Sequence, residues 1–191
     1  MTTTRTGHPE VLVVYASRNG GTAGIADTIA DELRANGLTV DVMSAHDASG
    51  DTMTLAGYGT VVLGSALYRG HWEKDALHFL RRHAVMLRGR RVWLFQSGPC
   101  GPQARADSER GAHEPAAVRR LREDVEAEPP ITFGGVLDPA TAHGFLARAM
   151  ARGELAGDYR DPDRIRSWAR TLTRTGSRPG GAHAGPVGRA V

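Results

Sequence analysis

Cysteine is almost absent from the 191-residue sequence, which contains only Cys100. A single cysteine excludes an internal disulfide framework and agrees with a reducing compartment. Long apolar runs are also absent, and no run approaches the length of a membrane span. Residues 1–9 are polar and lack the apolar core that a signal peptide needs. We therefore expect a cytoplasmic protein without an integral membrane segment.

A strong charge of either sign is missing as well. The formal net charge is +3 at pH 7, and the arginines are scattered instead of forming one basic run. Because proteins that bind nucleic acids usually carry a clustered basic patch, we expect no nucleic-acid partner. The histidines show no metal-ligand spacing, so the sequence predicts no metal site.

A strand, a turn and a helix follow one another near the start of the chain. The apolar run Val11–Tyr15 stops at Ser17–Thr22, and an apolar stripe at helical spacing, Ile25, Ile29 and Leu33, comes after it. Glycines let a backbone approach a ligand closely, hydroxyl groups donate hydrogen bonds, and the first N–H groups of a helix favour an anion. The sequence therefore predicts a phosphate-binding turn.

Two common classes of phosphate-binding protein do not match this turn. It lacks the Gly-Lys-Ser/Thr ending of a nucleotide triphosphatase, and Gly20, Gly21 and Gly24 are not spaced as in the dinucleotide fingerprint. A nucleotide triphosphatase and a classical NAD enzyme are therefore disfavoured.

Strands and helices alternate along the rest of the chain. The apolar patterns predict further strands at 38–42, 59–65, 91–96 and 131–137, and helices at 72–87, 114–125, 141–150 and 161–172. Alternation of this kind predicts an α/β protein with a parallel sheet covered by helices on both faces. Because the second strand has the pattern of an edge strand, we expect the strand order 2-1-3-4-5, with ligands beyond the carboxyl ends of the strands.

The predicted domain covers residues 10–175. Residues 1–9 are expected to form a flexible tail, and residues 176–191, rich in glycine and proline, are expected to be disordered because they cannot build a core.

Three loops should meet at the carboxyl edge of the sheet. The loop 17–22 suits a phosphate, the loop 65–72 carries aromatic rings, and the loop from 97 to about 107, within a polar stretch that continues to about 113, is small and flexible. A flat aromatic ligand that bears a phosphate would satisfy all three loops.

These loops resemble those of flavodoxins, which bind FMN, and most closely those of the flavodoxin-like protoporphyrinogen oxidases, a menaquinone-dependent branch. The turn of that branch reads hydroxyl-Arg-Asp-Gly-any-Thr, and Ser17–Thr22 matches it with Asn19 in place of Asp. The pattern Gly-Ala-Ser-Ile-Arg-Tyr-Gly-His-Tyr of its next loop resembles Gly64–Trp72 at both ends. The resemblance covers about residues 10–174. It implies a flavodoxin-like three-layer sandwich with a five-stranded parallel sheet.

Two departures from the branch affect the functional interpretation. The order of Tyr68 and Arg69 is reversed, which leaves open which side chain meets the flavin. The segment 138–161 is rich in alanine and glycine, where the membrane-associated oxidases are more aromatic and lysine-rich. Porphyrinogen oxidation coupled to a membrane quinone therefore ranks second to a general FMN-dependent function.

The resemblance implies which residues hold the cofactor. Hydroxyl, amide and backbone groups of the first loop would hold the phosphate, backbone groups of the second would face the reactive flavin nitrogens, and the third would close the other side. The complete implied set is Ser17, Arg18, Asn19, Gly20, Gly21, Thr22, Ser65, Ala66, Leu67, Tyr68, Gly70, Trp72, Ser97, Gly98, Pro99, Cys100 and Gly101.

Four of the candidate side chains have a second interpretation. Arg18 either adds charge at the phosphate or points to solvent, and Trp72 either borders the flavin or begins the buried stripe of a helix. Cys100 either affects the flavin or is incidental. His71 either assists proton transfer or is a surface histidine at the start of a helix.

Three functions remain after these comparisons of residue patterns. The first is an FMN-dependent oxidoreductase or electron carrier, the second is a protoporphyrinogen oxidase, and the third is a flavodoxin-shaped interaction module without a cofactor. The expected partners are a redox protein, a quinone or a small-molecule substrate. Small electron carriers are commonly acidic, whereas this chain has a pI near 9.5, which favours an enzyme or acidic partners.

Overall fold

The computed structural model describes residues 10–50, 55–111, 113–138 and 156–174. Its centre is a parallel sheet in the order β2-β1-β3-β5-β6. The strands are β1 Val11–Ala16, β2 Val40–Ser44, β3 Thr60–Tyr68, β5 Arg91–Ser97 and β6 Ile131–Phe133. With β5 and β6 as the fourth and fifth parallel strands, the expected order 2-1-3-4-5 is confirmed.

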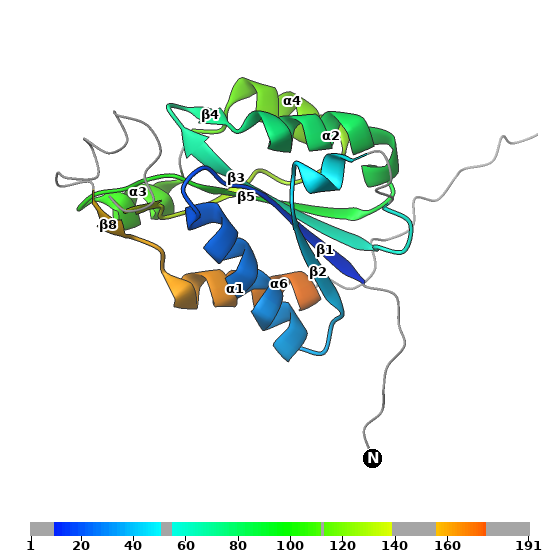
Figure 1. The fold of residues 1–191 in the computed structure, drawn as a ribbon, viewed down its shortest axis with the longest axis horizontal. Helices are drawn as coiled ribbons and strands as arrows, with labels where there is room; N and C mark the ends of the chain where they lie inside the picture. The colour runs from blue at the N-terminus through cyan, green and yellow to red at the C-terminus, as the bar shows by residue number, and fades with distance from the viewer. Residues whose placement is uncertain (1–9, 51–54, 112, 139–155, 175–191) are drawn as a thin grey trace, which may run out of the picture.

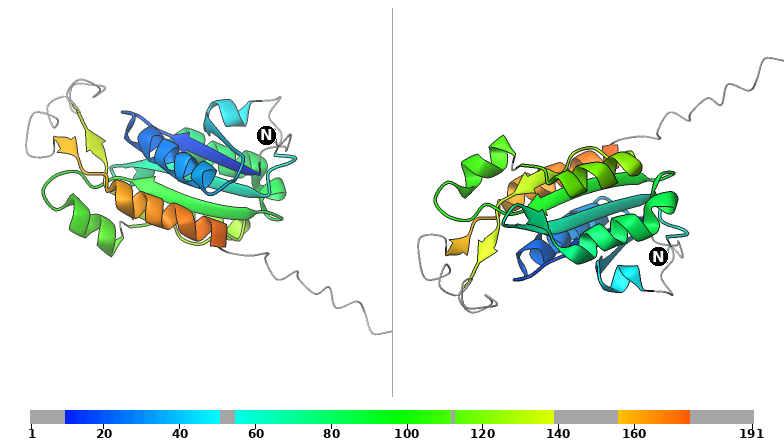
Figure 2. Two further views of the ribbon diagram at one scale, coloured as in Figure 1. Left: turned by 90° about the horizontal axis from the view of Figure 1, so that it is seen from below. Right: turned by 90° about the horizontal axis from the view of Figure 1, so that it is seen from above.

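Helices cover both faces of this sheet (Figures 1 and 2). The helices α1 Gly21–Ala35 and α6 Pro162–Arg174 pack side by side on one face. The opposite face carries α2 Lys74–Leu87 and α4 Ala116–Asp124, together with the short 3-10 turn η1 Asp47–Ser49. None of the helices in the described ranges combines the length and the apolar character that a bilayer crossing requires.

The uninterrupted apolar sequence of β1 is explained by its position between two layers of helices. Leu12 and Val14 join the core beneath α2, whereas Val11 and Val13 join the core beneath α1 and α6. Successive side chains of a strand point to opposite faces, so a strand with helices on both faces is buried at every position. This strand ends directly at the predicted phosphate-binding turn.

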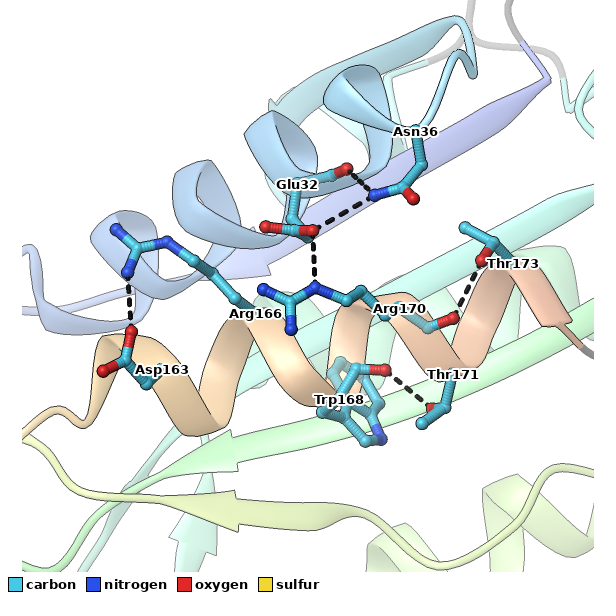
Figure 3. Close-up of polar contacts among 8 residues, drawn as sticks. All are labelled: Glu32, Asn36, Asp163, Arg166, Trp168, Arg170, Thr171 and Thr173. Carbon is cyan, nitrogen blue, oxygen red and sulfur yellow. Dashed lines mark hydrogen bonds and ion pairs between the residues drawn. The ribbon is translucent and has the colours of Figure 1, made fainter.

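An ion pair connects the two helices of one face (Figure 3). Arg170 Nε donates to Glu32 Oε1 over 2.8 Å, and Asn36 Nδ2 donates to the same carboxylate oxygen over 3.1 Å. The hydrogen bond from Arg170 lowers the pKa of Glu32. The pair joins α1 to α6 at the end of α1 that is remote from its first turn.

The region between β3 and α2 differs from the sequence-based expectation. The strand extends to Tyr68, and a hairpin pairs it with the two-residue strand β4, His71–Trp72, so Trp72 does not begin the helix. Arg69 and Gly70 form the turn with φ angles of 52° and 79°. Two positive φ angles in a two-residue hairpin loop match the twist of the flanking strands, which explains the extension of β3.

The segments after β5 also contain elements that the sequence patterns did not predict. The expected loop 97–113 includes helix α3, Ala104–Arg110, which ends at Gly111 with φ 78°. The expected strand 131–137 breaks after Phe133, and β7, Val136–Leu137, pairs antiparallel with β8, Gly157–Asp158. The predicted helix 141–150 and the predicted tails lie outside the described residues.

Candidate functional site

A pocket of about 510 Å³ lies at the carboxyl edge of the sheet. Figure 1 shows β4, α3 and β8 gathered at one end of the molecule. Residues from all three predicted loops line the pocket, together with a fourth segment that begins at Gly135. The lining residues are Ser17, Arg18, Asn19, Gly21, Thr22, Ala66, Leu67, Tyr68, Arg69, Ser97, Gly98, Cys100, Gly135, Val136 and Leu137.

The first turn of α1 forms one end of the pocket. Gly20 has φ 78°, a left-handed conformation that glycine adopts without strain, and α1 begins at Gly21. Helix α1 has no side-chain cap and no acidic residue in its first turn. A Cβ on Gly21 would lie 3.3 Å from the backbone nitrogen of Val136, so glycine permits the close approach of these segments. The positive end of the helix dipole therefore lines the pocket without a built-in anion.

Hydroxyl groups surround this helix end. The Oγ atom of Ser17 is buried and has no hydrogen-bond partner among the described residues. Thr22 Oγ1 and Ser97 Oγ lie 2.7 Å apart and are both buried. One hydroxyl hydrogen forms the bond between them, and the second remains available to donate elsewhere. A buried hydroxyl without a partner is uncommon, because leaving it unsatisfied costs free energy, and an anion oxygen would satisfy it.

The hairpin β3–β4 supplies an aromatic wall of the pocket through Tyr68. The guanidinium carbon of Arg18 lies 4.7 Å from the centroid of the Tyr68 ring. Arg18 also makes a two-pronged contact with Glu73, with Nε–Oε1 and Nη2–Oε2 distances of 3.2 Å each. The backbone N–H of Glu73 donates to Ser65 Oγ over 2.9 Å. The side chain of Arg18 therefore joins the turn before α1 to the aromatic hairpin.

The third wall combines the loop after β5 with a segment that the sequence patterns did not assign to the site. Gly135, Val136 and Leu137 line the pocket beside the helix turn, where Val136 approaches Gly21. A Cβ on Gly135 would lie 2.9 Å from Cys100 Sγ, so these two segments are closely packed. Burial raises the pKa of the Cys100 thiol, and the negative charge of Asp158 raises it further. The Gly134-Gly135 pair, a strand-breaking signal, could have placed this segment at the site.

Several residues of the implied set lie outside the pocket lining. They are Gly20, Ser65, Gly70, Trp72, Pro99 and Gly101. Trp72 is only 4% exposed, and its Nε1 donates to Gln96 Oε1 over 2.9 Å. Gln96 in turn donates through Nε2 to Thr132 Oγ1 over 3.0 Å. The structure thus places Trp72 in the core, which agrees with the second of its two interpretations, as a buried residue.

Two further side chains of the hairpin differ in their positions. His71 is exposed at the start of β4 and does not line the pocket, which agrees with a surface histidine. Arg69, which the implied set omitted, does line it. Within the described part of the chain, no group of three or more His, Cys, Asp or Glu side chains is arranged to hold a metal ion.

Comparison with known proteins identifies the fold and the family. The family model described as a flavodoxin domain matches residues 12–138. Flavodoxin 1 of Bacillus cereus in its oxidised form superposes with a TM-score of 0.57 and 19% identity, covering 87% of this chain and 99% of that chain. Rubredoxin oxygen:oxidoreductase of Desulfovibrio gigas superposes with a TM-score of 0.58 and 15% identity over 86% of this chain and 35% of that one.

Curated relatives match a shorter part of the chain. An Escherichia coli protein named protoporphyrinogen IX dehydrogenase (quinone) is 30% identical over 78 residues, which cover 41% of this chain and 42% of that protein. A Leishmania major protein of the same name is 32% identical over 76 residues, or 39% of this chain and 32% of that protein. The chain thus spans less than half the length of the curated relatives that it matches. The match of the family model over most of the described sheet shows that the chain belongs to the flavodoxin domain family.

Proposed function

We propose that the protein binds FMN in this pocket and acts as an FMN-dependent oxidoreductase or electron-transfer protein. The observation that carries this proposal is the buried Ser17 hydroxyl without a partner, which lies in the turn before the uncapped end of α1. A phosphate would accept from this hydroxyl and from the first N–H groups of the helix. The fold of the flavodoxins from Bacillus cereus supports the same cofactor.

The residues present fit both parts of FMN. Ser17, Thr22 and the N–H groups at the start of α1 would hold the phosphate, and the spare hydroxyl hydrogen of the Thr22–Ser97 pair would donate to it. Tyr68 and Val136 would cover the ring and exclude water from it. When bound, FMN supplies the transfer of one or two electrons, and the protein sets the potential and the access.

Charge around the pocket also contributes to the proposed function. Glu73 balances the positive charge of Arg18 through direct contact at 3.2 Å. We call the part of the pocket around Tyr68 the ring end, because it would face the flavin ring. It presents an aromatic face, and the charge of Arg18 there is neutralised by Glu73. Apolar and aromatic surroundings disfavour the build-up of negative charge on a reduced ring, which lowers the reduction potential.

Dehydrogenation of protoporphyrinogen with a quinone acceptor is the second candidate. It is favoured by the names of the curated relatives from Escherichia coli and Leishmania major. A flavodoxin-shaped module without a cofactor is the third candidate, but the unsatisfied Ser17 hydroxyl in a polar turn argues against it.

The absorption spectrum of the purified protein, recorded before and after titration with FMN, tests the leading proposal. We expect saturable binding with a flavin spectrum that is perturbed on binding. A protein that ignores excess FMN would overturn the proposal and leave the interaction module. Anaerobic turnover of protoporphyrinogen with a quinone would support the second candidate, and its absence with several acceptors would exclude that substrate.

A further inference from the structure

The contacts of Arg18 point to a role for this residue other than phosphate binding, and they give a role to Glu73, for which the resemblance to flavodoxins implies none. Arg18 belongs to the turn that precedes α1, where a cation would ordinarily be interpreted as a phosphate ligand. Its guanidinium nevertheless stacks on Tyr68 and is held edge-on by both carboxylate oxygens of Glu73. Two of its three nitrogens are therefore directed to the hairpin side of the pocket.

Glu73 is itself fixed by the backbone around it. It occupies the position before α2 with extended φ and ψ angles of −60° and 143°, and its N–H donates to Ser65 Oγ. Its side chain is 20% exposed, whereas that of Arg18 is 45% exposed. Glu73 has the more buried side chain of the two and a hydrogen-bonded backbone, so we infer that it determines where the guanidinium lies.

We propose that Arg18 and Glu73 form a positioning pair for Tyr68. The pair fixes the Tyr68 ring as the aromatic wall of the pocket and directs the Arg18 guanidinium to Glu73 instead of to a phosphate. This inference rests on the proposed binding of FMN. Both residues act through Tyr68, so they are positioning residues and not catalytic ones.

Comparison of FMN with riboflavin, which lacks the phosphate, separates this role from phosphate binding. Arg18→Ala should weaken the binding of FMN and riboflavin by the same factor, about two- to tenfold, since the loss is that of a stacked cation and an ordered ring. A phosphate ligand would instead weaken FMN alone. Equal affinity for riboflavin in the wild type and Arg18→Ala, with weaker FMN binding in the variant, would overturn the proposal.

Two further variants give opposite results under the two roles. Arg18→Lys keeps the positive charge but loses the planar fork and the stacking surface, so it should bind both flavins as weakly as Arg18→Ala. Glu73→Ala removes the carboxylate that holds Arg18 and should weaken both flavins. If Arg18 were a phosphate ligand, Arg18→Lys would retain FMN affinity and Glu73→Ala would raise it.

The ion pair between Glu32 and Arg170 provides a matched control (Figure 3). It also joins two elements, and its side chains are 15% and 54% exposed, close to the values for Glu73 and Arg18. Neither residue lines the pocket. Glu32→Ala and Arg170→Ala should therefore leave both flavin affinities within about twofold of the wild type, because a surface ion pair by itself contributes little to stability. If these variants lost as much flavin affinity as the Arg18 variants, the loss would be a general effect of removing an ion pair and the positioning role would be overturned.

A measurement on the protein without flavin tests the pair independently. In an NMR spectrum, the Arg18 Nε–H signal should be displaced by the ring current of Tyr68, and the displacement should disappear in Tyr68→Ala and Glu73→Ala. Signals that are the same in all three proteins would overturn the positioning role. If the wild type binds neither FMN nor riboflavin while the ring-current displacement is present, the proposed function fails and the contact between the pair and Tyr68 stands.

A double variant tests whether Arg18 acts through Tyr68. In the Tyr68→Ala background, the further change Arg18→Ala should not reduce riboflavin affinity again, because the two residues contribute through one ring. An additional loss equal to that of Arg18→Ala alone would show that Arg18 acts independently of Tyr68.

Discussion

The two ends of the pocket are built in different ways. The helix end is formed mainly by consecutive residues, Ser17–Thr22, that connect one strand to the helix after it, and Ser97 of β5 joins it through its hydrogen bond to Thr22. The ring end is assembled from the hairpin at Tyr68 and the loop at Gly98, and the segment at Val136 connects it to the first turn of α1. These segments are far apart in the sequence. A local motif determines the first end, whereas the second depends on how distant segments pack.

The two ends also differ in burial. At the helix end, Thr22 and Ser97 are 2% and 6% exposed and bonded to each other. At the ring end, Tyr68 is half-buried and Arg69 is exposed. The helix end should therefore tolerate little change in its polar groups, and the ring end should respond mainly to changes in how its segments pack.

The largest expected effect separates the ends by ligand. Thr22→Ala removes one hydroxyl of the buried pair, and FMN affinity should fall about 10- to 100-fold, the usual cost of losing a hydrogen bond to a charged group. Riboflavin affinity should change by less than about twofold. Fluorescence titration with both ligands measures this.

The matched control is Thr28→Ala in the same helix, whose hydroxyl donates to the carbonyl of Gly24 over 2.8 Å. It should leave both affinities unchanged. Equal weakening of FMN and riboflavin in Thr22→Ala would contradict the assignment of the helix end to the phosphate.

The second prediction disrupts the ring end through its backbone. A Cβ on Gly134 would lie 2.0 Å from the carbonyl oxygen of Tyr159, so Gly134→Ala must displace the strand pair β7–β8. The free energy of unfolding should fall by about 1–3 kcal/mol, as for other overpacked sites. Affinity for FMN and riboflavin should fall together, because Val136 moves with this segment.

Chemical denaturation gives the stability, and flavin titration gives the affinities. Gly59→Ala is the control, since a Cβ there meets no atom within 4 Å and its φ angle is not positive. If Gly134→Ala were as stable as Gly59→Ala, the close approach of Gly134 to Tyr159 would not determine where the chain leaves β6.

The helix end and the strand order follow from the sequence because each has a local pattern. The run from Val11 to Leu33 contains an apolar strand, a glycine turn and a helical stripe, and the structure contains these elements in the same places. The weak alternation at 38–42 correctly indicated an edge strand. These patterns arise because each element is buried on one or two faces, and each residue is apolar or polar according to whether its own position is buried.

The ring end could not be derived in this way. Arg69 adopts a positive φ angle, which is uncommon for a residue other than glycine and depends on the pairing of Tyr68 with His71. Helix α3 has no apolar stripe, and its ordering involves Arg164 of α6, which donates to Ser108 Oγ and Ser108 O. Val136 reaches the pocket only because β8 pairs with β7 from a later part of the chain. The last two features are decided by distant segments, and the first by the pairing within the hairpin.

A third prediction concerns a group at neither end. Burial lowers the pKa of His83 below its ordinary value of 6.5, and its Nε2 lies 3.0 Å from the carbonyl oxygen of Ala48. The unfolded chain then binds a proton at a pH where the folded protein does not. The contribution of His83 to the free energy of unfolding is therefore fully present above pH 6.5 and decreases as the pH falls below that value.

Thermal unfolding between pH 7.5 and pH 5 checks this expectation. In the variant His83→Gln, which keeps an amide donor for Ala48, the decrease in melting temperature on acidification should be smaller than in the wild type. Flavin affinity at pH 7.5 should be the same in both proteins. An equal decrease in both would show that other groups control acid unfolding.

The smallest effect is expected at Cys100. Its Sγ makes only a weak contact with the carbonyl oxygen of Gly98, at 3.5 Å, and its raised pKa keeps the thiol protonated near neutral pH. Cys100→Ala should change the affinity for either flavin by less than about twofold, since a thiol is a weak hydrogen-bond donor. Alkylation of the wild type, followed by mass spectrometry, should be slow at pH 7 and faster at high pH.

The buried chain of hydrogen bonds from Trp72 through Gln96 to Thr132 has a consequence for how the protein folds. It connects β4, β5 and β6, so it cannot close until residue 132 has joined the sheet. A strand shifted by one residue would turn Gln96 to the opposite face and leave Trp72 and Thr132 without this partner. The hydrogen bonds that hold the hairpin of Tyr68 therefore also fix the register of β5 and β6, so a change at Gln96 would disturb the ring wall and the edge of the sheet together.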